Sequence, residues 1–100
     1  MPKIFEYFGL VFFFYSNEHE PIHVHVIQGD RQLIYEIMIE NGKFKSVVRR
    51  NAKGYLPLSQ RDAKIAEDFI RVYALDIVQK WIDYFIMKKP VHCTYIKTRI

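Results

Sequence analysis

Residues Leu33–Arg49, with the sequence LIYEIMIENGKFKSVVR, indicate a β-hairpin. The dipeptide Asn41-Gly42 in its middle readily adopts the positive φ angles of a tight hairpin turn. The flanking residues are rich in isoleucine, valine and aromatic side chains, which favour strands. We therefore predict two antiparallel strands, Leu33–Glu40 and Phe44–Arg49, joined by this turn.

Two more strands are expected before the hairpin. Val11–Ser16 is rich in aromatic residues, and Ile22–Ile27 alternates apolar residues with His23 and His25. Alternate side chains of a strand point to opposite faces, so one face of this strand is apolar and the other carries both imidazoles. The simplest topology is a meander of four antiparallel strands within residues 1–50.

The second half of the chain changes to a helical period. Ser59, followed three residues later by Asp62, is typical of a helix N-cap. Apolar residues then recur at helical spacing, but their stripes do not keep one phase across Ala74–Asp76. Residues 59–87 are therefore expected to form one kinked helix or two helices, ended by Lys88-Lys89-Pro90.

These elements predict an α+β fold. We expect an antiparallel sheet of four to five strands, with one kinked or two helices packed on one face. Val91–Ile100 is prone to form the last strand, and residues 1–100 are expected to form a single domain. The apolar contacts expected between the helical segment and the sheet join Phe69, Ile77 and Trp81 to Val24 and Val26.

The composition supports one hydrophobic core. The chain has 100 residues, half of them apolar and 16% aromatic, which excludes a disordered chain. The single cysteine, Cys93, excludes an intramolecular disulfide and fits the cytoplasm. The opening residues lack the layout of a signal peptide. The apolar run Phe8–Tyr15 is far shorter than the ~20 residues that cross a bilayer, so we expect no membrane partner.

The histidines suggest a metal site. His23 and His25 share one strand face, and neutral imidazoles bind divalent transition metals. Glu18, His19 and Glu20 lie just before this strand and could add ligands. The alternative is a polar sheet face whose imidazoles bind no ion.

The same pair also fits metal-free catalysis. His23 and His25 could act as general base and general acid on a phosphodiester, with Tyr15 adding a hydroxyl group. In the alternative, Tyr15 only packs at the rim of the sheet.

Basic residues are clustered in two places. The net charge is +4, from 15 basic and 11 acidic residues. The first cluster has no acid between Asn41 and Arg61, and the second, near the C-terminus, also has none. Such clusters neutralise phosphates, so the first is a candidate surface for RNA or DNA, although a solvated face is the alternative. The members of the first cluster are Lys43, Lys45, Arg49, Arg50 and Lys53; those of the second are Lys88, Lys89, Lys97 and Arg99.

Three consecutive phenylalanines, Phe12–Phe14, suggest an interface. Alternation along the strand sends Phe13 to the face opposite its two neighbours. We therefore expect an exposed aromatic stripe, which usually marks a contact surface, and either a homodimer or a small protein partner.

The first 26 residues, MPKIFEYFGLVFFFYSNEHEPIHVHV, resemble the opening of the bacterial family known as domain of unknown function 4160. Its motif His-x-Pro-x-His-x-His is matched by His19, Pro21, His23 and His25. A later strand and a helical segment are matched by Tyr35–Glu40 and by Val78–Trp81. The resemblance covers about residues 1–85 and does not include the C-terminal strand.

The resemblance implies a small protein without an agreed activity. Members of this family are often encoded beside another small protein, the domain of unknown function 2442, an arrangement typical of toxin–antitoxin pairs. Our leading hypothesis is thus a toxin–antitoxin-like module that binds a small cognate protein and also RNA or DNA. The alternatives are a small metal-dependent or His-pair nuclease or phosphoesterase, and a non-catalytic interaction or DNA-binding domain.

Overall fold

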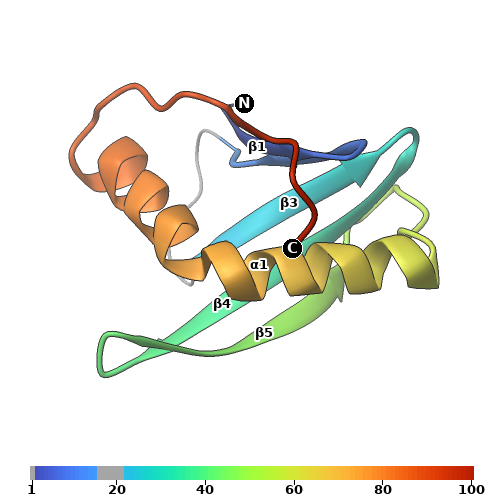
Figure 1. Ribbon diagram of the computed structural model, residues 1–100, viewed down its shortest axis with the longest axis horizontal. Coiled ribbons are helices and arrows are strands. Elements are labelled where there is room, and N and C mark those ends of the chain that lie inside the picture. The colour runs from blue at the N-terminus through green and yellow to red at the C-terminus, as the bar shows by residue number, and fades with distance from the viewer. Residues whose placement is uncertain (1, 16–21) are drawn as a thin grey trace.

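The computed structural model describes residues 2–15 and 22–100, and it places a long helix across one face of a sheet (Figure 1). The strands are β1 (Lys3–Tyr7), β2 (Leu10–Phe13), β3 (His23–Gln28), β4 (Arg31–Glu40), β5 (Lys43–Asn51) and β6 (Thr94–Ile96), and the helices are α1 (Gln60–Trp81) and the π-helix η1 (Ile82–Ile86). The strand order is β5-β4-β3-β2-β1-β6. The five N-terminal strands form an antiparallel meander, and β6 pairs with β1 in parallel. The predicted α+β class is confirmed.

The central hairpin forms where it was predicted. Asn41 and Gly42 have φ angles of 54° and 76°, and these positive values suit the turn that joins two twisted strands. The pair Glu40 and Lys43 flanks the turn. An irregularity follows between Met38 and Ile39, where the register of the two strands shifts.

The described part of the sheet has six strands, because β1 adds one to the four or five expected. The turn between β1 and β2 consists of Phe8 and Gly9, with φ angles of 43° and 86°. A phenylalanine in a positive-φ turn position is unusual, so the sequence carries no ordinary turn signal there. The C-terminal strand is shorter than residues 91–100, and only Thr94–Ile96 pair with β1.

Helix α1 begins and bends as expected. The Ser59 side chain accepts a hydrogen bond from the backbone nitrogen of Asp62 at 3.1 Å. The kink lies at Tyr73, which has non-helical angles of φ −104° and ψ 17°. This residue directly precedes Ala74–Asp76, where the apolar stripes lose their common phase. The long helix is therefore one kinked helix, extended by η1.

The core lies between α1 and the face of the sheet that carries Val24 and Val26. Phe69, Ile77 and Trp81 are buried in the same apolar cluster as these two valines, which confirms the predicted contacts. The face that carries the histidines points away from α1.

The expected exposed aromatic stripe is wrong. Phe12, Phe13 and Phe14 are all buried. Phe13 does occupy the histidine face, as its pairing with His25 shows, but its ring stacks on His25 at 5.4 Å and meets Tyr15 at 5.5 Å. In the described residues, His25 of β3 and Tyr15 just after β2 thus cover Phe13 on the face that α1 does not cover.

Tyr35 gives a test of the contact between helix and sheet. Its hydroxyl donates a hydrogen bond to the carbonyl oxygen of Ala63 in α1 at 3.2 Å. Burial, with help from the nearby Glu67 carboxylate, raises the pKa of Tyr35 above its ordinary value of 10.0. A raised folded-state pKa stabilises the fold below pH ~10, and this stabilisation is lost as the pH rises further.

The variant Tyr35→Phe is expected to lose about 1 kcal/mol of unfolding free energy at pH 7. It should also show a shallower decline in stability above pH ~10, because it lacks the phenol whose ionisation opposes folding. Urea unfolding at a series of pH values measures both effects, with the exposed Tyr55→Phe as the control. Identical alkaline slopes for wild type and Tyr35→Phe would contradict this account.

Candidate functional site

The two histidines of β3 lie side by side on the sheet face that α1 does not cover. Their ring centroids are 5.6 Å apart. His25 lies opposite Ile34 of β4, and His23 lies opposite Glu36. His23 is half-buried, whereas His25 is only 3% exposed. The shared face and the partial access of one imidazole agree with the alternation of the sequence.

His25 belongs to a compact group that we call the His25 cluster: Phe13, Tyr15, His25 and Gln32. The Tyr15 ring meets the imidazole edge-on at 4.2 Å. The side-chain nitrogen of Gln32 lies 3.0 Å from Nδ1 of His25 and 3.5 Å from the Tyr15 hydroxyl. With the amide nitrogen as donor, Nδ1 is the acceptor and carries no proton. Rings on two sides and this hydrogen bond orient the imidazole.

Gln32 is the residue of this site that the sequence analysis missed. It is almost fully buried, and its side-chain oxygen has no hydrogen-bond partner among the described residues. An unpaired buried acceptor costs about 1–3 kcal/mol. The pairing of β3 with β4 could have indicated this residue. Gln32 lies opposite Ile27, and Ile27 is two positions after His25, so both point to the histidine face.

The metal hypothesis has two of its residues in the described structure. His23 and His25 are adjacent, but Glu18 and His19, like Glu20, lie outside residues 2–15 and 22–100. Within those residues, no group of three or more histidine, cysteine, aspartate or glutamate side chains could hold a metal ion. A divalent transition metal therefore remains a prediction that depends on residues 16–21.

The catalytic hypothesis finds its three residues close together. All three residues lie on the histidine face. The Tyr15 ring contacts the His25 ring, which in turn lies beside the His23 ring. However, His25 is packed between aromatic rings, and this packing favours a structural role for it. His23 is the more accessible imidazole for a reaction with a bound molecule.

The first basic cluster is divided between the two faces of β5 and the turn after it. Arg49 faces α1, where its Nε donates to the Glu67 carboxylate at 2.8 Å. This hydrogen bond raises the pKa of Arg49. Arg50 lies on the histidine face, opposite Ile34, and its Nε is 3.9 Å from a carboxylate oxygen of Glu36. The two neighbouring arginines therefore cannot contact one phosphate backbone from the same side.

The remaining members of that cluster are exposed. Lys45 forms an ion pair of 2.7 Å with Glu40 across the hairpin. Lys43 borders the hairpin turn, and Lys53 lies after β5 in a turn. Carboxylates thus neutralise much of the charge that the sequence alone shows as an uninterrupted run.

The histidine face also carries apolar side chains, which we call the open face: Val11, Ile27, Ile34, Met38 and Val48. Register places them all on this side, since Val11 pairs with Ile27 and Glu36 pairs with Val48. Met38 and Val48 are 41% and 44% exposed, and the other three are half-buried. In the part of the chain that the structure describes, no helix packs on this side.

Together these features define a small α+β protein: a meander sheet with one helical layer, an oriented histidine cluster and an open face. The chain belongs to the family described as domain of unknown function (DUF4160), whose model matches residues 9–82. No curated protein and no solved structure shows significant similarity to the chain. Among residues 2–15 and 22–100, no helix has the length and apolar character needed to span a membrane.

Proposed function

We propose that this protein is a partner-binding module of the toxin–antitoxin type, and that its open face receives a small cognate protein. The observation that carries the proposal is the position of Met38 and Val48. Both are large apolar side chains in regular strands, and both are exposed on the layer opposite α1.

The chemistry of the open face suits a protein surface. Apolar side chains occupy several neighbouring strands, and the pair Glu36 and Arg50 lies among them. Contiguous apolar patches with polar residues around them are typical of protein interfaces. The His25 cluster lies on the same sheet face, where its ring contacts and its hydrogen bond join β2, β3 and β4.

Charge changes on the open face test the proposal. The double variant Met38→Glu/Val48→Glu is expected to weaken binding of the protein encoded by the adjacent gene at least tenfold, because carboxylates would be buried without partners. Calorimetric titration of the two purified proteins measures this loss. Growth of cells that express either protein alone or both together tests the toxin–antitoxin assignment.

A matched control is available on the opposite layer. Val72 and Leu75 are exposed apolar residues on α1, so Val72→Glu/Leu75→Glu introduces the same charges away from the open face. If the partner still binds the Met38→Glu/Val48→Glu variant but no longer binds the Val72→Glu/Leu75→Glu variant, the interface lies on α1 instead. A second copy of the chain would be the occupant if two results are found together. The wild type forms a concentration-dependent homodimer that Met38→Glu/Val48→Glu disrupts, and the protein encoded by the adjacent gene does not bind.

A further inference from the structure

The whole net charge of the protein lies in its last 17 residues. Residues 84–100 contain four basic side chains and no acidic one, whereas the other eleven basic residues are balanced by eleven acidic ones. The four are Lys88, Lys89, Lys97 and Arg99. This segment begins just beyond residues 9–82, which the family model matches.

These four cations have no acidic partners in the described structure. The ion pairs among residues 2–15 and 22–100 use Lys45, Arg49, Arg50 and Lys64 as their basic members. Among the described residues, three of the five members of the first basic cluster therefore have carboxylate partners, and none of the four C-terminal cations has one. An unneutralised positive surface attracts polyanions most strongly.

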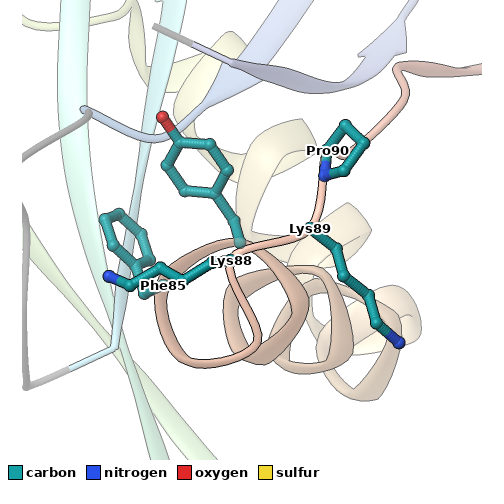
Figure 2. Close-up of a pocket in the computed structure, with 5 residues that line it drawn as sticks. Phe85, Lys88, Lys89 and Pro90 are labelled. Carbon is teal, nitrogen blue, oxygen red and sulfur yellow. The ribbon is translucent and has the colours of Figure 1, made fainter.

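A first hollow lies at the end of η1 and is lined by Tyr84, Phe85, Lys88, Lys89 and Pro90 (Figure 2). Lys88 extends past the Phe85 ring, while Lys89 points in the opposite direction. Lys88 has a φ of 56°, which is the left-handed conformation that glycine usually supplies where a helix ends. A lysine there costs backbone stability relative to glycine.

A second hollow lies beside β6 and combines rings with cations. Phe8, Tyr95 and Lys97 line it, together with Glu6. Tyr95 is 60% exposed, and Phe8 is exposed as well. The Arg99 guanidinium sits over the Phe8 ring, 3.8 Å from its centroid. The Glu6 carboxylate repels phosphate from the hollow itself but can accept hydrogen bonds from the amino group of a base.

We propose that residues 84–100, together with Phe8, bind single-stranded nucleic acid. Bases stack on Tyr84 and Tyr95, and the phosphates between them run past the lysines. Unstacked bases on aromatic rings beside a cationic surface are how proteins bind single strands without reading sequence. Paired bases in a duplex could not reach either ring. This surface is separate from the open face and does not depend on the proposed protein partner.

The test uses the full chain and a fluorescein-labelled oligouridylate of about 12 nucleotides, a length within the range that one small domain covers. Fluorescence anisotropy is expected to show binding that weakens steeply as salt is raised. Tyr95→Ala should weaken it about tenfold. Lys88→Gly should weaken it about threefold or more, while the unfolding midpoint stays equal or rises because glycine suits the backbone.

Two control variants each remove an exposed aromatic ring or an exposed cation that lies outside residues 84–100. Tyr55→Ala deletes an exposed ring outside the segment, and Lys43→Gln deletes an exposed cation at the other edge of the sheet. Both should bind like wild type. Equal losses in these controls would overturn the assignment to residues 84–100. So would binding of a DNA duplex as tightly as the single strand, or binding to vesicles with anionic lipid in place of the oligonucleotide.

Discussion

Replacing Phe69 with alanine is expected to remove about 3–5 kcal/mol of unfolding free energy. Phe69 is fully buried on α1, and its ring is the centre of the aromatic core. It lies 4.6 Å from Phe12, 4.8 Å from Tyr7, 5.4 Å from Phe5 and 4.5 Å from Tyr73 between ring centroids. Alanine would leave a cavity facing strands β1 and β2 and the kink of the helix.

The loss should be a large part of the stability of the protein, since small domains are stable by only about 5–15 kcal/mol. Urea unfolding followed by circular dichroism measures it. Phe69→Leu keeps most of the apolar volume and should lose much less, while the exposed Val72→Ala should change stability by less than about 0.5 kcal/mol. A loss for Phe69→Ala no larger than that of Phe69→Leu would show that the core collapses around the site.

The hairpin and the kink were predictable because their signals are local. Asn41-Gly42 specifies its own turn, and the broken phase near Ala74 records the change of helix direction at Tyr73. Strand β1 was missed because Phe8-Gly9 takes up positive φ angles without turn-forming residues at both positions. That conformation occurs together with tertiary packing, in which the Arg99 guanidinium lies 3.8 Å from the centroid of the Phe8 ring.

The site was predictable only in part for a related reason. Alternation places His23 and His25 on one face, because it needs only the period of a strand. The burial of Phe13 and His25 could not be predicted, since it comes from side chains on other strands, Gln32 among them. The basic run of β5 likewise gave no sign of Glu67, which neutralises Arg49 from the helix.

Lys80→Met is the second variant for which a large loss is expected, about 2–3 kcal/mol. The Lys80 ammonium has three hydrogen-bond donors. It donates to the carbonyl oxygens of Ile4 at 3.0 Å and His92 at 2.7 Å and to the Thr94 hydroxyl at 2.9 Å. One side chain of α1 thus fastens both β1 and the segment that enters β6. Its ammonium also lies 4.5 Å from the centroid of the Phe5 ring.

Burial acts against these contacts, because it lowers the pKa of Lys80 below its ordinary value of 10.5. The folded state therefore disfavours the charged amine, and this penalty applies in full at pH values below the lowered pKa and is lost as the pH rises through it toward 10.5. Methionine removes the penalty along with the hydrogen bonds, so the net loss is smaller than three charged hydrogen bonds would suggest. The hydrogen bonds prevail because each donor of the ammonium has an acceptor.

Hydrogen exchange at individual amides tests whether Lys80 holds β6 in place. Hydrogen exchange in Lys80→Met should accelerate at the amides of Thr94–Ile96, whose pairing with β1 has lost its anchor, and should stay slow in β3 and β4. Lys64→Met is the matched control, because Lys64 makes only an exposed ion pair of 2.7 Å with Asp68, and such pairs contribute little. If both variants lose the same stability and β6 exchanges as in wild type, β6 is held by its three backbone pairs with β1, and the role assigned to Lys80 is wrong.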